Sequence, residues 1–347
     1  MPRTSLTLPS HLQSLFCRLL RFRGVVHDKH MRPTVILLML LVACTRSGNG
    51  GKTDEGPLVV FNAGSLARPI RAALDSFAAR EGVRFEQEQA GSLETARKLT
   101  ELGRVPDVIA LADYEVFPQL LVPEHTTWYA KFARNRMVLA HTRKSRHADS
   151  VNGQNWWRIV LRPGIESGHA DPNVDPAGYR ALLVFQLAER YYRAPGLAAR
   201  LRRAVPARNV RPKSADLVAL IETGELDYGW EYESVARSSS LPFVTLPDSI
   251  SLGNARDSAF YAIASVRVVG SRPGDTITIR GEPIMYALSI PRRAEHPRVA
   301  ERFVQFVLSN EGRRILRANH LDALDSAVVS GDGAPAWLSE QRSLNAP

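Results

Sequence analysis

Two short turns place serines at points where a helix is predicted to begin. The tetrapeptide Ala-Gly-Ser-Leu occurs twice, with Ser65 after an apolar run and Ser92 after a second extended segment. A glycine–serine pair at a helix start offers free backbone N–H groups, a hydroxyl donor and the positive end of the helix dipole. These groups suit an anion with several oxygens. The alternative is an ordinary N-cap, for which serine is among the preferred residues.

Nucleophilic chemistry is poorly supported by the residues around these serines. A serine nucleophile needs a neighbouring base and a shaped turn such as G-x-S-x-G, and neither turn matches that pattern. The nine histidines are scattered, without H-E-x-x-H spacing, and the chain has no P-loop or G-x-G-x-x-G motif. These observations favour binding over catalysis.

Two later segments have the same form as the serine turns. Asp175 precedes a proline at an expected helix start, and Ser214 precedes another helix that leads to Tyr232 in a strand. Each has an ordinary structural explanation, because Asp-Pro commonly starts helices and a buried tyrosine often belongs to the core. Four helix starts and one tyrosine together make a more specific pattern of groups that could face one ligand.

The elements that must position these residues alternate between strands and helices. Short apolar runs at 58–61 and 108–111 are predicted strands, and periodic segments follow them as helices, with Leu93, Ala96, Leu99 and Leu102 recurring every three residues before Gly103. Further strands are expected at 136–141, 227–232 and 283–290. This alternation predicts an α/β fold with mainly parallel sheets flanked by helices, which bind ligands at the carboxyl ends of strands.

The first 44 residues have the features of an export signal. An apolar run from Val35 to Ala43, too short to span a membrane, ends at Cys44 in a pattern that resembles a bacterial lipobox. We expect lipidation of Cys44 and a flexible tether at 45–56. For residues 1–30 there are two interpretations: a gene-model artefact, with translation from Met31, or an unusually long basic n-region of the signal.

Removing this prefix changes the charge and the cysteine count. Residues 1–44 hold six of the 45 basic and one of the 35 acidic residues, which leaves 39 and 34 and a net charge of +5. This mild charge gives no nucleic-acid signature. Both cysteines, Cys17 and Cys44, lie in the prefix, so the folded body has neither disulfides nor thiolate metal sites.

Seven segments together carry a resemblance to a known family. The chain resembles the tungstate/molybdate-binding proteins of ABC transporters, within the periplasmic-type oxyanion receptors, over nearly all of residues 57–320. The segments are FNAGSL, QAGSLETARKLTELGRVPDVIALADYEVFPQLL, WYAKFARNRMVLAHT, NWWRIVLRPG, DPNVDPAGYRALLVFQLAE, RPKSADLVALIETGELDYGWEYESVA and EPIMYALSIP.

The resemblance implies a two-lobed type II binding-protein fold with the ligand between the lobes. The first lobe would take residues 57–137 and 283–347, and the second lobe residues 138–282. The implied protein is a monomeric, lipid-anchored extracytoplasmic receptor that binds molybdate or tungstate without a cofactor. It would deliver the oxyanion to the permease and ATPase subunits of an ABC importer.

The resemblance also implies which residues hold the oxyanion. The expected ligand-binding residues are Gly64, Ser65, Ser92, Asn173, Val174, Asp175, Ser214 and Tyr232. In archaeal members of the family two carboxylates approach the metal and expand its coordination. One matches Asp175, and the other corresponds to Ser214, where those members carry glutamate.

That serine leaves the choice of oxyanion open. A site of N–H and O–H donors recognises a tetrahedral dianion, whereas a carboxylate on the metal selects a centre that can expand its shell. Glu231 is a candidate replacement, but neighbours in a strand point to opposite faces, so Glu231 should not face the ligand if Tyr232 does. The alternatives are a sulfate or phosphate receptor and an enzyme with Asp175 as base. A cation receptor fits worse, because hard cations prefer several oxygen ligands.

Overall fold

The computed structural model describes residues 56–270 and 274–338, which belong to a compact unit spanning Glu55–Pro347. The expected signal segment, Cys44 and the tether up to residue 55 lie outside the described residues. Within the described part of the chain, no helix is both long and apolar enough to cross a membrane.

The first sheet has six strands in the order β13-β4-β12-β3-β1-β2. Strand β1 pairs in parallel with β2 and β3, whereas β12 runs antiparallel to β3 and β4. The carboxyl ends of β1, β2 and β3 therefore lie at one edge. The strands are β1 (Leu58–Ala63), β2 (Phe85–Ala90), β3 (Val108–Leu111), β4 (Trp128–Arg134), β12 (Met285–Ser289) and β13 (Asp322–Gly331).

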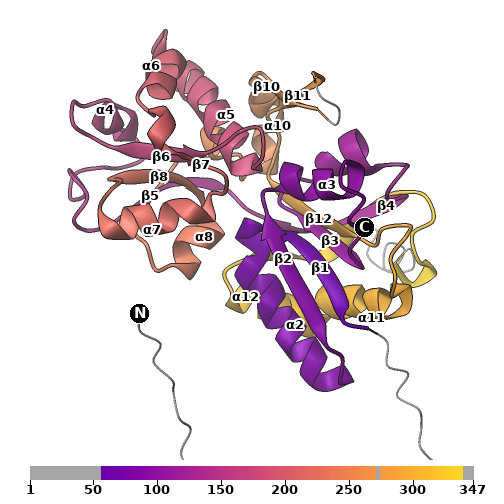
Figure 1. Cartoon of the computed structure of the whole chain (residues 1–347). Helices are drawn as coiled ribbons and strands as arrows, with labels where there is room; N and C mark the ends of the chain where they lie inside the picture. The colour runs from indigo at the N-terminus through magenta and orange to yellow at the C-terminus, as the bar shows by residue number, and fades with distance from the viewer. Residues whose placement is uncertain (1–55, 271–273, 339–347) are drawn as a thin grey trace, which may run out of the picture. The chain divides into compact units, whose positions relative to one another are not determined.

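Helices cover both faces of this sheet (Figure 1). Because β2 and β3 lie on either side of β1, right-handed crossovers put the two intervening helices on opposite faces. The helices are α2 (Ala67–Glu81), α3 (Ser92–Thr100), α11 (Pro297–Leu308) and α12 (Asn310–Ala318). Phe77 of α2 packs against Phe303 and Phe306 of α11, with ring centroids 5.3 and 5.8 Å apart, so the end of the chain completes the first core.

The second sheet has five strands in the order β7-β6-β8-β5-β9. Strand β6 pairs in parallel with β7 and β8, so their carboxyl ends also lie at one edge. The strands are β5 (Met137–His141), β6 (Ser167–Ala170), β7 (Val210–Arg211), β8 (Tyr228–Tyr232) and β9 (Phe243–Thr245). The chain enters this sheet at β5 and returns to the first sheet at β12.

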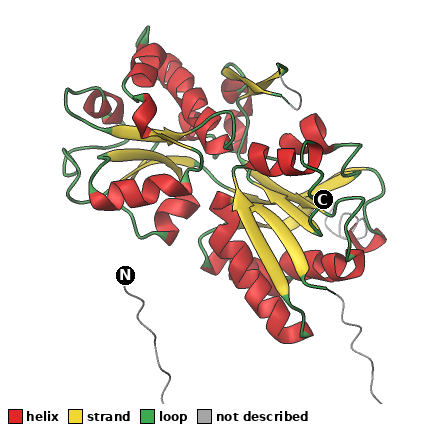
Figure 2. Ribbon diagram, viewed as in Figure 1, coloured by secondary structure: helices red, strands yellow, loops and turns green. Residues whose placement is uncertain are grey.

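Helices also flank the second sheet (Figure 2). They are α4 (Trp156–Val160), α5 (Pro176–Tyr191), α6 (Leu197–Arg203), α7 (Ala215–Thr223), α8 (Glu233–Ser238), α9 (Asp248–Ser251) and α10 (Ser258–Tyr261). A separate hairpin is formed by β10 (Ser265–Val269) and β11 (Thr276–Arg280). Trp230 of β8 lies between Trp156 and Phe185, with centroids 5.0 and 4.9 Å away, at the centre of the second core.

The predicted α/β architecture with two helix-flanked sheets is confirmed, and most predicted elements form. One helix ends early: α3 stops at Thr100, and Leu102, expected on its apolar face, has 66% of its surface exposed. The chain has already left the helix before Gly103 adopts a positive φ of 62°. The three-residue apolar spacing therefore continues past the end of the helix.

Candidate functional site

The first sheet contributes two buried serine hydroxyls at the carboxyl ends of β1 and β2. Ser65 Oγ accepts a hydrogen bond from the hydroxyl of Tyr286 at 3.1 Å. Ser92 Oγ accepts one from the backbone N–H of Ala112 at 3.0 Å. Each oxygen is held as an acceptor, which leaves its own proton for a further partner.

Neither serine is a side-chain helix cap. Gly91 occupies the N-cap position of α3, and no side-chain cap bond forms there or at the turn that contains Ser65. Ser214 lies at the N-cap position of α7, also without a side-chain cap bond. The N-cap explanation therefore does not account for these three serines, because their hydroxyls accept no hydrogen bond from a helix N–H group.

The second sheet contributes a buried carboxyl with two backbone partners. Asp175 caps α5 by accepting from Ala177 N at 2.8 Å, and its other oxygen accepts from Ser214 N at 3.1 Å. Burial raises the pKa of Asp175 to about 6, against the lowering effect of these two hydrogen bonds and of Arg180. The same contacts bring the start of α7 to the start of α5. Ser214 Oγ has no hydrogen-bond partner among the described residues.

A second buried carboxyl lies beside Asp175. Glu231 is fully buried in β8, and its Oε1 has no hydrogen-bond partner among the described residues. Burial and then the charge of Asp175 raise its pKa well above the usual value, while Ser214 lies close enough to lower it. Strand alternation predicts opposite directions for Glu231 and Tyr232, yet the charge of Asp175 also raises the pKa of Tyr232. Both side chains are therefore within electrostatic reach of Asp175.

Tyr232 offers a fourth hydroxyl. Its oxygen accepts a hydrogen bond from Arg180 Nη1 at 2.6 Å, which leaves the phenolic proton for another acceptor. Its ring meets that of Tyr286 edge to face at 5.9 Å. Since Tyr286 also bonds Ser65, this contact connects the serine of the first sheet to the tyrosine of the second.

A buried ion pair that was not predicted from the sequence joins the two sheets. Arg180 of α5 donates to Ala112 O at 2.7 Å and lies 3.3 Å from Asp113 Oδ2, directly after β3. The hydroxyl of Tyr179 also donates to Asp113. The available signal was an arginine within the otherwise apolar stretch 177–185. Arg180 brings a positive charge close to the two hydroxyls at Ser92 and Tyr232.

The structure places Asn173 and Val174 differently from Asp175. Val174 O accepts from the first free N–H groups of α3, Leu93 N at 3.2 Å and Glu94 N at 3.4 Å. The carbonyl of Asn173 accepts from Arg97 at 2.8 Å. The backbone at these two positions therefore contacts the first sheet's helix α3. Only Asp175 of this segment contributes its side chain to the buried polar group.

Gly64 lies where the first sheet meets α7. A side chain there would come within 3.8 Å of Lys213 and 4.0 Å of Ala215. Gly64 and Ser65 line a cavity of about 290 Å³ together with α7 and α8 residues that include Ala215 and Val235. The cavity therefore adjoins Ser65.

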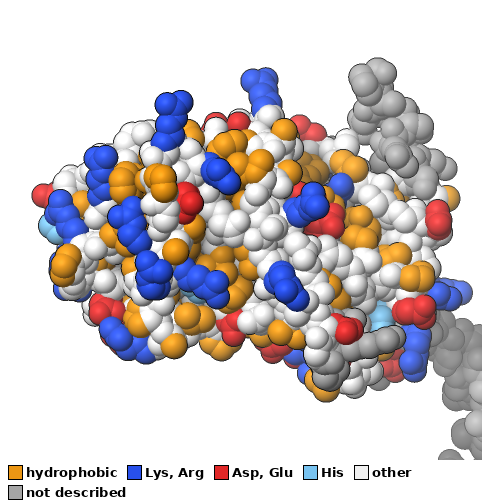
Figure 3. Space-filling model, turned by 90° about the horizontal axis from the view of Figure 1, so that it is seen from above, with side chains coloured by type: hydrophobic (Ala, Val, Ile, Leu, Met, Phe, Trp, Pro, Cys, Tyr) orange, Lys and Arg blue, Asp and Glu red, His pale blue; other side chains and the backbone are white. Residues whose placement is uncertain are grey.

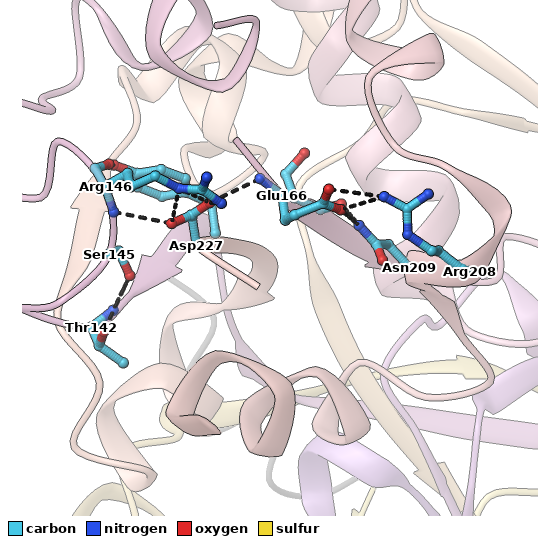
Figure 4. Close-up of polar contacts among 9 residues, drawn as sticks. Thr142, Ser145, Arg146, Glu166, Arg208, Asn209 and Asp227 are labelled. Atoms are coloured by element: carbon cyan, nitrogen blue, oxygen red, sulfur yellow. Dashed lines mark hydrogen bonds and ion pairs between the residues drawn. The ribbon is translucent and has the colours of Figure 1, made fainter. Parts of the chain in front are cut away.

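A rigid polar network supports the strand that carries Glu231 and Tyr232. Just before β8, Asp227 receives three hydrogen bonds from the guanidinium of Arg146, donated by Nε and Nη2, and one from Glu166 N (Figure 4). The carboxylate of Glu166 in turn accepts from Arg208 and Asn209, at 2.8 Å each. These contacts fix β8 against β6 and so help to position the carboxyl pair.

The surface of the second sheet's half is strongly basic. The stretch from Arg190 to Lys213 contains eight basic residues and no acidic one, and it ends one residue before Ser214. Figure 3 shows Lys and Arg side chains gathered over this half of the molecule. Positive charge is therefore concentrated in the stretch that contains α6 and β7 and ends just before Ser214. The net charge of residues 45–347 is nevertheless only +5.

The combined chemistry suits an anion with several oxygens. Four hydroxyls have a proton to donate, two buried carboxyls lie close to Ser214 and Tyr232, and Arg180 supplies a positive charge. No group of three or more His, Cys, Asp or Glu side chains that could hold a metal cation occurs among the described residues.

Comparisons with known proteins identify the family of this chain. Residues 58–322 match the family described as bacterial extracellular solute-binding protein. An uncharacterized solute-binding protein of Petrotoga mobilis is 46% identical over 287 residues, covering 82% of this chain and 89% of that protein. The molybdate/tungstate-binding protein WtpA of Pyrococcus abyssi is 34% identical over 334 residues, covering 86% and 94%.

Solved structures of periplasmic binding proteins share the fold. The sulfate-binding protein SubI of Mycobacterium tuberculosis aligns with a TM-score of 0.55 at 14% identity, covering 83% of this chain and 91% of that one. The periplasmic molybdate-binding protein of Azotobacter vinelandii aligns with a TM-score of 0.54 at 14% identity, covering 76% and 98%. The fold predicted from the sequence is thus confirmed, and this chain belongs to the bacterial extracellular solute-binding protein family.

Proposed function

We propose that this chain is an extracytoplasmic receptor that binds molybdate or tungstate and passes it to the permease and ATPase subunits of an ABC importer. It performs no chemistry on the ligand. The name of the Pyrococcus abyssi relative supports this ligand class. The observation that carries the proposal is the set of uncommitted protons at Ser65, Ser92, Ser214 and Tyr232, the last two of which lie close to a buried carboxyl pair.

The four hydroxyls would bind the oxygens of the anion. A tetrahedral dianion accepts hydrogen bonds at every oxygen, and charge-assisted bonds of this kind are stronger than neutral ones. The two serines of the first sheet and the Ser214–Tyr232 pair of the second come from different halves of the molecule. Ligand binding would therefore hold the halves together.

The carboxyl pair would supply the choice among anions. Asp175 and Glu231 would approach the metal of molybdate or tungstate, whose coordination shell can expand. The sulfur of sulfate does not readily accept further oxygen ligands, so the same carboxylates would repel it. Glu231 would thus replace the second metal-binding carboxylate, which this chain lacks at position 214.

Calorimetric titration tests this proposal. Residues 55–347 should bind molybdate and tungstate tightly, and sulfate and phosphate at least about a hundredfold more weakly, about 2.8 kcal/mol. Ser214→Ala should weaken oxyanion binding, whereas Ser150→Ala, at an exposed serine, should leave it unchanged. Sulfate binding as tight as molybdate binding would contradict the assignment.

The protonation state gives an independent test of the carboxyl pair. Burial raises the pKa of Asp175 to about 6 and that of Glu231 in the same direction, so the ligand-free site keeps its protons to a higher pH than exposed carboxyls do. Carboxylates that bind the metal must lose them. Titrations in buffers of different ionisation enthalpy at about pH 6 should show proton release. Proton uptake would mean that the carboxyls donate hydrogen bonds to the anion instead.

The remaining features concern anchoring and organisation. We propose that Cys44 carries a lipid and that 45–56 tethers a monomeric receptor to the membrane. The two lobes would be 57–137 with 283–347, and 138–282. Palmitate labelling of the exported protein should disappear in Cys44→Ala. Labelling that persists in this variant would reject the anchor.

A further inference from the structure

Arg97 joins three segments that are far apart in the sequence. It lies on α3, one helical turn after Leu93, so both residues face the same side of the helix. Its Nη1 donates to Asn173 O at 2.8 Å, and its Nη2 donates to Val269 O at 2.7 Å and to Gly270 O at 3.4 Å. One side chain from the first half thus holds the loop before Asp175 and the β10–β11 hairpin.

The segments that Arg97 holds also bind each other. Asn173 Oδ1 accepts from Val269 N at 3.2 Å, so the loop and the hairpin are also joined directly. The same loop reaches the start of α3, where Val174 O accepts from Leu93 N at 3.2 Å. Only 16% of the Arg97 side chain is exposed, and its bond to Asn173 O is partly buried, whereas its bond to Val269 O lies at the surface.

The backbone geometry shows how closely the two halves meet at this point. A Cβ atom on Gly91 would lie 2.1 Å from Val174 O, closer than any real contact allows. Residue 91 must therefore be glycine for the loop to reach α3 as it does here. The contact is one residue from Asp175 and one residue from Ser92.

We propose that Arg97 is a clasp that holds the closed form and sets the rate at which bound ligand leaves. This inference rests on the proposed receptor function. Its bonds join protein to protein, so they stabilise closure equally whichever oxyanion is bound. Arg97 acts on Asp175 through the loop and does not touch the ligand. It is a positioning residue that affects residence time and leaves selectivity unchanged.

Release kinetics provide the main test. In Arg97→Ala, the dissociation rate of molybdate and of tungstate should rise about 10- to 100-fold. The proposed reason is that the hydrogen bonds of the Arg97 guanidinium stabilise only the closed form, so their removal destabilises that form alone. The association rate and the ratio of the two affinities should change less than about twofold. Arg97→Lys, which can keep one bond, should fall between. The matched control is Arg71→Ala on α2, whose side chain pairs with Asp75 of its own helix.

Two further variants separate the clasp from the receptor function. Small-angle scattering of the full chain without oxyanion should give a larger radius of gyration for Arg97→Ala and for Gly91→Ala than for wild type. An unchanged radius in both variants, or an unchanged dissociation rate in Arg97→Ala, would overturn the clasp. A changed affinity ratio would also overturn it, because Arg97 would then contact the ligand. Wild type that binds no oxyanion would reject the receptor function, while the scattering result would still decide the clasp.

Discussion

Replacing Glu231 with glutamine should stabilise the ligand-free protein more as the pH rises. Glu231 Oε2 accepts from Tyr232 N at 3.3 Å, and Oε1 has no hydrogen-bond partner among the described residues. Glutamine can keep the first bond through its carbonyl oxygen and places an amide group near Ser214. The substitution removes a titrating group from the site without removing a hydrogen bond.

The raised pKa of Glu231 determines how the free energy of unfolding changes with pH. Burial and Asp175 raise the folded-state pKa of Glu231 above 4.5, so the folded protein holds this proton more tightly than the unfolded chain. The resulting stability is fully present below about pH 4.5 and is lost as the pH rises through the folded-state pKa. Within that window the free energy of unfolding falls by about 1.4 kcal/mol per pH unit.

Asp175 contributes a similar loss over a lower range in both proteins. Its pKa rises from 3.8 to about 6, which is worth about 3 kcal/mol by the same conversion. That part is common to wild type and Glu231→Gln. The difference in stability between them should therefore grow by about 1.4 kcal/mol per pH unit above about pH 4.5, and then become constant.

Urea unfolding between about pH 5 and pH 8, followed by tryptophan fluorescence without oxyanion, measures this difference. The buried tryptophans Trp156 and Trp230 lie in the same half as Glu231 and report its unfolding. Glu86→Gln, at an exposed position on β2, is the matched control and should give a constant difference. A pH-independent difference for Glu231→Gln would refute the reasoning, because the carboxyl would then titrate alike in both states.

Three other substitutions test different parts of the molecule. Arg180→Met leaves Asp113 buried without its cation and should lower the free energy of unfolding by about 3–5 kcal/mol, measured by urea; a loss below about 1 kcal/mol would contradict this. Tyr286→Phe removes the donor that orients Ser65 and should weaken molybdate binding about tenfold in calorimetry, with only about 1 kcal/mol lost in stability. Phe303→Ala should cost about 3–5 kcal/mol of stability and leave the affinity ratio of molybdate to tungstate unchanged.

The strands and helices could be predicted because their periodicity records burial. Val299, Phe303 and Phe306 were expected on one helix face, and all three are buried in α11. The carboxyl-end placement of Ser65 and Ser92 also follows from the alternation of elements. What periodicity could not give was the use of each hydroxyl, because that depends on Tyr286 and Ala112, which are distant in the sequence.

The second half of the site was harder to predict for the same reason. Alternation in β8 predicts that Glu231 and Tyr232 point to opposite faces. Tyr232 is the last residue of β8 and also the N-cap residue of α8. The alternation of side chains between the two faces of the strand therefore ends at this residue. The ion pair of Arg180 with Asp113 joins residues 67 positions apart and left no local signal except an arginine in an apolar helix.

The basic segment that leads to Ser214 bears on how a scarce anion is found. Dianions reach a protein by random diffusion, and a positive surface raises their local concentration before any hydrogen bond forms. Added salt screens such a field over about 10 Å at 0.1 M, so capture slows while the contacts inside the site keep their strength. If the proposed receptor function holds, the arginines between Arg190 and Arg211 would raise the rate of oxyanion capture. The buried hydroxyls and carboxyls would set the rate of release.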